Sequence, residues 1–210
     1  MTQEERTRAS RALILNAAAK EFALNGYKHA SVNRICEAGR ISKGKMFHHF
    51  KDKDDIFVGI YELFYSSLGD HMENFSYSED ESLEDILNGL FRQRQSYIFD
   101  HPYQSLFLRN NTMAIPEHLK DRCAYMRDSF YKREGNMLHT ILDEVSPEFD
   151  KESKEMIIRI FGVASNYVHL NITSNQVFDP EKDMSRLKES NAHLFGNVIH
   201  TMLYGIYPRD

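Results

Sequence analysis

A polar segment near the start of the chain carries the residues best suited to chemistry. Ser42-Lys43-Gly44-Lys45 places a hydroxyl before two lysines, and His48 follows almost one helical turn later. A serine at this place can cap a helix, whose free N–H groups then attract anions. Lysines beside such a helix start suit phosphates and the acceptor-rich edge of guanine. Gly44 would let the backbone approach closely. The segment is therefore a candidate for contact with DNA.

The residues around this segment predict a helix-turn-helix. Ser31 can cap a first short helix, and Ala38-Gly39 can turn the chain. Ser42 can then cap a second short helix that ends near His49. The apolar residues expected to pack the pair together are Val32, Ile35, Ile41, Met46 and Phe50. This packing leaves the first turn of the second helix projecting from the protein. Such helical pairs also occur in proteins that do not bind DNA, so both interpretations stay open on the pattern alone.

The charge distribution indicates a polyanionic partner for the first part of the chain only. The 210 residues carry a formal net charge of −5. Residues 1–53 hold eleven Lys and Arg against five Asp and Glu, whereas residues 54–210 hold 15 against 26. A net +6 beside a net −11 favours binding of nucleic acid by the basic end. Chance fluctuation of charge in a short window is the alternative.

Little in the sequence predicts catalysis, metal binding or membrane insertion. Cys36 and Cys123 stand far apart in helical patterns, which indicates neither a disulfide framework nor a zinc site. No apolar run approaches the roughly 18 residues of a membrane span, and the polar start lacks a signal-peptide core. The sequence contains no recognisable Ser-His-Asp order, phosphate-binding loop or pair of catalytic carboxylates. We expect a cytoplasmic protein that is not an enzyme and uses no cofactor.

The ten histidines do not form a metal-binding pattern. None has a glutamate three residues before it, the spacing used by di-iron helix bundles. His193 and His200 are seven residues apart and share one face of the last predicted helix. A structural role is the main interpretation of this pair, and a metal or pH-sensing role is the alternative.

Helical periodicity extends over almost the whole chain. The first helix is predicted from Glu5 to Leu24, where Asn25-Gly26 ends it. Asp52 is expected to cap a fourth helix. The remaining helices are predicted at 53–75, 82–100, 103–113, 117–145, 151–174 and 182–206. The five prolines fall between these segments, and no strand is predicted. The expected fold class is all-α, with about nine helices.

The segment over residues 10–60 also resembles a known family. The matching residues are Ile14-Leu15-Asn16-Ala17-Ala18, Phe22, Gly26-Tyr27, Ser31-Val32, Ile35-Cys36, Ala38-Gly39, Ile41-Ser42-Lys43-Gly44, His48-His49-Phe50 and Lys53. Their spacing is similar to the N-terminal signature of the TetR (tetracycline repressor) family of transcriptional regulators. The resemblance implies a three-helix DNA-binding domain over 1–52 and a helical effector-binding and dimerisation domain over 53–210. The implied DNA-binding residues are Ser31, Arg34, Ser42, Lys43, Gly44, Lys45, Phe47, His48, His49 and Lys53.

One residue departs from the family pattern at the implied DNA surface. Phe47 stands where the family usually has a tyrosine whose hydroxyl bonds a phosphate. The phenylalanine keeps the ring and loses that hydrogen bond, which is worth about 0.5–1.5 kcal/mol. Lys43, Lys45 and Lys53 are expected to compensate through charge.

Aromatic residues are spread over the central predicted helices. The chain has 14 Phe, 11 Tyr and no Trp. Each aromatic residue taken alone is typical of a hydrophobic core. Together these residues are typical of a mostly apolar pocket with a few polar anchors. The candidate effector-pocket residues are Phe91, Arg94, Tyr97, Phe107, Arg109, Asn110, Tyr125, Phe130, Phe161, Asn166, Tyr167 and His169.

The last two predicted helices are apolar on more than one side. Such helices are buried on two faces, which predicts a four-helix contact across a two-fold axis. The candidate dimer-interface residues are Phe161, Ser165, Val168, Leu194, Phe195, Val198, Ile199 and Met202. The alternative is that both helices are central to a single subunit.

These patterns together predict a homodimeric regulator that binds a near-palindromic operator in double-stranded DNA. A small-molecule effector would release it, with repression as the default that the resemblance implies. One alternative is an all-helical enzyme or ligand carrier whose N-terminal helices are only structural. A regulator that binds DNA and senses nothing is another.

Overall fold

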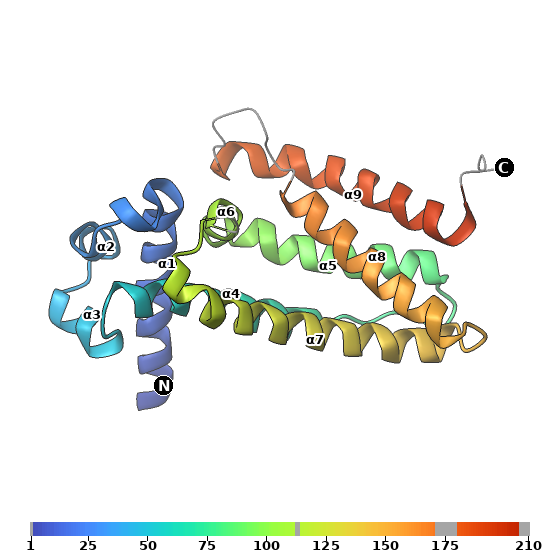
Figure 1. Ribbon diagram of the computed structural model, residues 1–210, viewed down its shortest axis with the longest axis horizontal. Helices are drawn as coiled ribbons and strands as arrows, with labels where there is room; N and C mark the ends of the chain where they lie inside the picture. Colours follow the sequence, from blue (N-terminus) through green and yellow to red (C-terminus); the bar gives the residue numbers. More distant parts are fainter. Residues whose placement is uncertain (1, 112–113, 171–179, 206–210) are drawn as a thin grey trace. The chain divides into compact units, whose positions relative to one another are not determined.

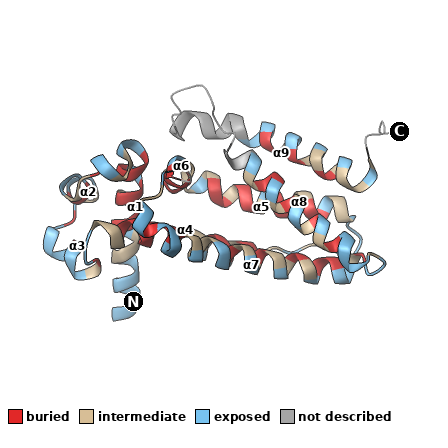
Figure 2. Ribbon diagram, in the orientation of Figure 1, coloured by how far each residue is buried: buried red, intermediate tan, exposed pale blue. Residues whose placement is uncertain are grey.

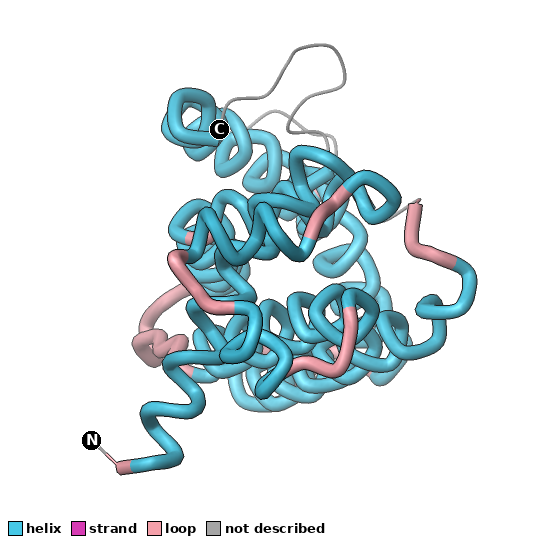
Figure 3. The backbone as a smooth tube through the Cα atoms, turned by 90° about the vertical axis from the view of Figure 1, so that its left-hand side faces the viewer, coloured by secondary structure: helices cyan, strands magenta, loops and turns pink. Residues whose placement is uncertain are grey.

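The computed structural model describes residues 2–111, 114–170 and 180–205, with side chains at all of these except 168–170 and 180–187. Over this part of the chain there is no strand (Figures 1 and 3). The helices are α1 (Gln3–His29), α2 (Val32–Gly39), α3 (Lys43–His49), α4 (Lys53–Glu73), α5 (Leu83–Asp100), α6 (Pro102–Asn111), a 3₁₀ turn η1 (Glu117–Leu119), α7 (Lys120–Val145), α8 (Lys151–Leu170) and α9 (Pro180–Tyr204). The predicted all-α class is therefore confirmed.

The predicted helix boundaries agree with these bounds to within a few residues. Predicted helical residues at 112–113, 171–174 and 206 lie outside the described residues. None of the described helices combines the length and apolar composition that crossing a bilayer requires.

The chain forms two compact units. Unit 1 comprises Met1–Ser67 and His101–Ser129, and unit 2 comprises Leu68–Asp100 and Phe130–Asp210. Helices α4 and α7 therefore each contribute to both units. This grouping by contact differs from the predicted functional boundary between residues 52 and 53, which stays a prediction.

Three phenylalanines form the centre of unit 1. The Phe57 ring lies edge-on to Phe22 at 5.3 Å and to Phe107 at 4.9 Å between centroids. Each is almost entirely buried. Helix α6 lies beside α1, and two hydrogen bonds connect them. The Gln104 amide of α6 donates to Asn16 of α1 at 2.6 Å, and Asn110 of α6 donates to the Ala23 carbonyl of α1 at 2.9 Å. These contacts fix α1, the helix on which the helix-turn-helix rests.

Gly26 interrupts α1 where the sequence predicts its end. Its φ of 67° and ψ of 171° lie outside the helical region, in a conformation that only glycine adopts readily. A last helical turn continues to His29, and the Ala30 N–H donates to the Gly26 carbonyl at 3.1 Å. The predicted break is confirmed, and the extra turn is a feature that the sequence did not indicate.

In the turn between α2 and α3, Gly39 is required because there is no room for a side chain, and not because of its backbone conformation. Arg40, not Gly39, takes the left-handed conformation, with φ of 50°. A Cβ on Gly39 would lie 2.4 Å from the Ile41 side chain and 3.1 Å from the Ala17 Cβ. Gly39 therefore allows close packing of the turn on α1, while Arg40 bears the backbone strain.

Unit 2 is organised around a second aromatic cluster. The rings of Phe91 on α5 and Phe195 on α9 stack at 3.8 Å, and Phe161 on α8 meets Phe195 edge-on at 5.4 Å. All three are almost completely buried. Buried residues follow the inner sides of α5 and α8 (Figure 2). Helices α5, α8 and α9 therefore form one packed body.

Candidate nucleic-acid interface

The first turn of α3 stands clear of the fold. The Lys45 N–H donates to the Ser42 Oγ at 3.2 Å, so Ser42 caps the helix as predicted. Lys43, Gly44 and Lys45 are all exposed, whereas Met46 is fully buried. One buried residue thus anchors the helix while its capped, cationic start faces outward. The projection predicted for this turn is confirmed.

The second half of α3 divides between solvent and the fold. Phe47 keeps half of its surface exposed, and His48 is also exposed. His49 is turned back toward α1, with its Nε2 3.1 Å from the Ser10 Oγ. Burial and the nearby His48, Lys45 and Arg11 lower the pKa of His49, which favours its neutral form. Of the predicted pair, His48 therefore lies with the exposed lysines and His49 does not.

Ser31 and Arg34 both donate hydrogen bonds to Glu21, a residue that the sequence analysis did not identify. The Glu21 carboxylate accepts the Ser31 N–H at 2.9 Å and the Arg34 Nε–H at 2.7 Å. The Ser31 side chain makes no capping bond to α2, so the predicted cap is wrong. The signal available was the position of Glu21, three residues after Ala18 on the inward stripe of α1.

Burial and hydrogen bonding act in opposite directions on Glu21. Burial would raise the pKa of its carboxyl, but bonds from Arg34, the Ser31 N–H and Asn25 lower it below the usual value of 4.5. Glu21 is therefore held ionised, and it positions Arg34 at the side of α2. Half of the Arg34 side-chain surface stays exposed.

Lys53 caps the end of α1 at the start of α4. Its Nζ donates to the carbonyls of Tyr27 at 2.7 Å and Ala30 at 3.4 Å, and lies 4.4 Å from the Tyr27 ring centroid. Asp52 caps α4 as predicted, through the Asp55 N–H at 2.9 Å. An ammonium has three N–H bonds, so one of those on Lys53 is not used by these carbonyls.

The predicted effector-pocket residues fall in both units. In unit 1, Phe107 belongs to the core and Asn110 bonds the Ala23 carbonyl. Arg109 contacts its neighbour Asn110 at 3.3 Å, and Tyr125 is 71% exposed. Phe107 and Asn110 therefore serve the packing of unit 1, whereas most of the Tyr125 side chain is exposed.

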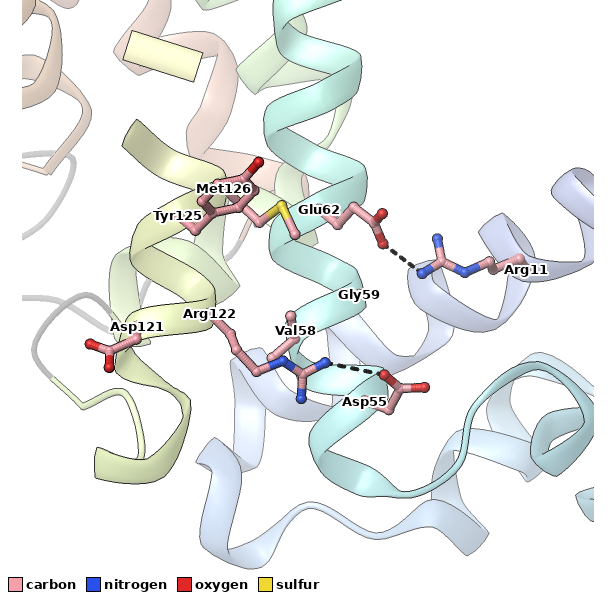
Figure 4. A pocket seen from close by; sticks show the side chains of 9 residues that line it. All are labelled: Arg11, Asp55, Val58, Gly59, Glu62, Asp121, Arg122, Tyr125 and Met126. Carbon is pink, nitrogen blue, oxygen red and sulfur yellow. Dashed lines mark hydrogen bonds and ion pairs between the residues drawn. The ribbon is translucent and has the colours of Figure 1, made fainter. Parts of the chain in front are cut away.

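A pocket of about 450 Å³ in unit 1 does include Tyr125 (Figure 4). Two ion pairs cross it, Arg11 to Glu62 at 2.7 Å and Arg122 to Asp55 at 3.3 Å. They join α1 and α7 to α4. Its charged walls differ from the aromatic lining that the sequence predicted.

Unit 2 gathers several of the predicted pocket residues around a buried ion pair. Arg94 donates to Glu134 at 2.9 Å and to Asn166 at 2.7 Å, and its guanidinium lies 5.4 Å from the Phe130 ring centroid. Both charged side chains are only 4% exposed. Glu134 was missed, although an acid one turn after Phe130 on the apolar stripe of α7 was a usable signal.

The other pocket residues of unit 2 have different surroundings. Tyr97 is buried, with His71 5.6 Å away between centroids. Phe91 and Phe161 belong to the aromatic cluster, whereas Tyr167 is 60% exposed. The side chain of His169 lies outside the described residues.

Half of the predicted dimer-interface residues face the inside of unit 2. Phe161, Ser165, Phe195 and Ile199 have no exposed surface within the single chain. A side chain without exposed surface cannot touch a partner, so these four belong to the subunit core. They were misplaced because periodicity shows that a helix has two apolar faces but not which face packs internally. Leu194 is exposed, Val198 and Met202 are half-buried, and the Val168 side chain lies outside the described residues.

An all-helical chain with a capped, exposed and cationic third helix has the structure of a helix-turn-helix protein. A family model described as "Bacterial regulatory proteins, tetR family" matches residues 14–60. The regulator AcrR of Shigella flexneri is 33% identical over 189 residues, which is 86% of each chain. UidR of Escherichia coli K12 is 29% identical over 137 residues, covering 60% of this chain and 68% of UidR.

Solved structures share the fold at low sequence identity. FadR from Bacillus subtilis, in complex with stearoyl-CoA, superposes with a TM-score of 0.68 at 14% identity, covering 93% of this chain and 99% of FadR. Salmonella enterica GusR gives a TM-score of 0.66 at 20% identity, covering 93% and 95%. The chain belongs to the TetR family and is a helix-turn-helix transcriptional regulator.

Proposed function

We propose that the chain is a homodimeric repressor that binds a near-palindromic operator and is released by a small-molecule effector. The observation that carries the DNA contact is the first turn of α3, where Lys43, Gly44 and Lys45 are exposed behind the Ser42 cap. Lys43, Lys45 and His48 read base edges in the major groove. Two such helices in a dimer meet successive groove faces about 34–36 Å apart.

Phosphate contacts come from the sides of this turn. Ser31 directly precedes α2, Arg34 lies on α2, and the remaining N–H of Lys53 lies at the start of α4. All three belong to unit 1 and are close to α3 in sequence. Gly44 would allow close approach of the backbone, since a Cβ there meets nothing within 4 Å. Phe47 supplies an exposed ring for apolar contact, for example with a thymine methyl group.

The dimer contact uses the outer faces of α8 and α9. Val163 and Tyr167 are 70% and 60% exposed and lie four residues apart on α8. Leu194 on α9 is 41% exposed, and Val198 follows it one turn later. An exposed apolar stripe on two adjacent helices is typical of a helical dimer interface.

Effector binding is assigned to unit 2. The stearoyl-CoA bound by Bacillus subtilis FadR supports small-molecule binding on this fold, without naming the ligand of this chain. A switch from nearly full to nearly empty operator requires the effector to distinguish two conformations by about 5.5 kcal/mol.

Selection of bound sequences from random DNA, followed by a salt titration, tests the DNA contact. The wild-type chain should select a near-palindrome and lose affinity steeply as salt rises. Lys43→Ala/Lys45→Ala should abolish the preference for the selected site while the thermal unfolding temperature stays unchanged. Lys132→Ala/Lys151→Ala is the matched control, because it removes the same charge from exposed positions of unit 2. Equal loss in both double variants, or in neither, would refute the assignment.

A further inference from the structure

A layer of buried polar side chains crosses unit 2 one helical turn from the aromatic cluster. Gln95 on α5, Ser165 on α8 and Asn191 on α9 are 3%, 0% and 7% exposed. Within the described part of the chain, both amide atoms of Gln95, the Ser165 Oγ and the Asn191 Nδ2 have no hydrogen-bond partner. Native proteins pair nearly all buried polar groups, so unpaired atoms on three neighbouring helices indicate a missing bonded group.

The helix directions place these three residues at one level. Figure 1 shows α5 and α8 running the same way and α9 running the opposite way. Gln95 follows Phe91 by four residues, Ser165 follows Phe161 by four, and Asn191 precedes Phe195 by four. Because Phe91 and Phe161 both contact Phe195, four residues in these directions lead to the same side of the cluster.

A direct hydrogen bond supports this register. Arg94 donates to Asn166 at 2.7 Å, and these two residues are the immediate chain neighbours of Gln95 and Ser165. The antiparallel pairing of α5 with α9 is fixed further along, where His200 lies 3.3 Å from Glu84. Gln95, Ser165 and Asn191 therefore lie at one level of unit 2, on three helices.

The charge at this level is already balanced. Glu134 neutralises Arg94 through contacts of 2.9 and 3.3 Å, and both side chains are buried. An added carboxylate would be buried close to Glu134, and an added ammonium would be buried close to Arg94. Either would bring an uncompensated charge into a low-dielectric interior. The unpaired atoms of Gln95, Ser165 and Asn191 are the donors and acceptors of neutral amides and a hydroxyl. The Arg94 Nε–H is a further unpaired donor at this level, on a guanidinium whose charge Glu134 already balances.

We infer that this layer, Gln95, Ser165 and Asn191, holds the polar head of the effector, and that this head is a neutral amide or hydroxyl. The body of the ligand is apolar or aromatic, because the neighbouring level of the bundle is formed by Phe91 and Phe161. The inference rests on the proposed effector site in unit 2, and it narrows the ligand to uncharged molecules with a hydrogen-bonding end.

A set of small aromatic probes that differ only in their head group tests the inference without DNA. Benzamide and benzyl alcohol carry neutral heads, benzoate and benzylamine carry charges, and toluene carries no polar head. Ligand-observed NMR should detect binding of the two neutral polar probes to the full-length protein at millimolar concentration, the range expected for ligands of this size. Benzoate, benzylamine and toluene should bind at least about tenfold more weakly.

Two glutamine variants separate a ligand contact from a structural one. Gln95→Met removes an amide that has no partner, so the thermal unfolding temperature should not fall while benzamide binding is lost. Gln93→Met is the matched control on the same helix, because the Gln93 amide donates to the His71 carbonyl at 3.0 Å. It should lower the unfolding temperature and leave benzamide binding intact.

Several outcomes would overturn the inference. Preferential binding of benzoate or benzylamine would show a charged site, and absence of binding by every probe would show a layer that holds only water. A lower unfolding temperature in Gln95→Met would show that its amide is bonded within the protein. Because no arm uses DNA, these failures are distinct from failure of operator recognition.

Discussion

At the scale of single residues, two serines occupy the same position before consecutive helices and act differently. Ser42 accepts the Lys45 N–H through its hydroxyl, whereas Ser31 donates its own backbone N–H to Glu21. The hydroxyl of Ser31 makes no capping bond. The stability of α3 therefore depends on a side chain that the stability of α2 does not require.

Substitution of each serine by alanine should separate these roles. Ser42→Ala should lower the free energy of unfolding by about 1 kcal/mol, the usual cost of losing an N-cap. Ser31→Ala should change it by less than about 0.5 kcal/mol, as surface substitutions do. Urea denaturation followed by circular dichroism measures both. Equal losses would show that Ser31 also caps its helix in solution.

Glu21 is expected to make part of the stability depend on pH. Its pKa in the folded state is lowered, so its contribution is complete above the unfolded value of 4.5 and is lost as pH falls through the lower folded value. Glu21→Gln should therefore reduce the free energy of unfolding by about 1.5–3 kcal/mol at pH 7, the range for hydrogen bonds to a charged group.

The difference between wild type and Glu21→Gln should narrow as the pH of the denaturation experiment is lowered below 4.5. Glu37→Gln serves as a control, since Glu37 is an exposed acid on the adjacent helix α2. A difference that stays constant down to acid pH would contradict the assigned role of Glu21.

At the scale of helices, two glycines with open space around them play opposite roles: one ends a helix and the other lies within a helix. Gly26 has a positive φ and ends the main part of α1, whereas Gly44 lies inside α3. A Cβ at either position would meet nothing within 4 Å, so sterics do not distinguish them. The backbone conformation does.

Gly26→Ala should lower the free energy of unfolding by about 1–3 kcal/mol, because alanine is strained in this conformation. Gly44→Ala should raise it by about 0.5–1 kcal/mol, because alanine favours a helix, while weakening operator binding through the added methyl group. Chemical denaturation and fluorescence anisotropy with the selected operator measure the two effects. Stabilisation by Gly26→Ala would show that α1 ends elsewhere in solution.

The sequence predicts these helices well because their signals are local. Capping by Ser42 and Asp52, the break at Gly26 and the 3.6-residue periodicity each act within one or two turns. The polar contacts of the site were less predictable. The partner of Ser31 is Glu21, ten residues away on another helix, and the partner of Arg94 is Glu134, forty residues away. Such pairs depend on tertiary packing, which no local pattern contains.

The misplaced interface residues have a similar explanation. Ser165 and Val163 lie on one helix and are both compatible with a close helix contact, but one is fully buried and the other is 70% exposed. Distinguishing the inner from the outer face requires knowing where α5 and α9 lie. The sequence predicted that α8 has two apolar faces and could not assign them.

At the scale of the whole molecule, we expect the outer face of α8 to determine the oligomeric state. Val163→Glu places a charge on the proposed dimer contact and should convert the dimer to a monomer at micromolar concentration, since burying an unpaired charge is costly. Sedimentation velocity gives the mass, and circular dichroism should show unchanged helix content.

Tyr125→Glu is the matched control, because Tyr125 is equally exposed but lies on α7 in unit 1. It should remain dimeric. A Val163→Glu variant that stays dimeric would place the contact on another surface. Because only a dimer presents two recognition helices, monomeric Val163→Glu should also lose most of its affinity for the near-palindromic site.

The position of Lys53 limits how its ammonium can bind a DNA phosphate. Its ammonium already binds the carbonyls of Tyr27 and Ala30, where the last turn of α1 meets the first of α4. A phosphate bound there would be held by the same group that joins the two helices. Sliding of α4 relative to α1 would break the bonds from Lys53 to these carbonyls and would also move its ammonium away from the phosphate. A shift of the helix and the loss of a contact to the DNA backbone would therefore occur in a single step.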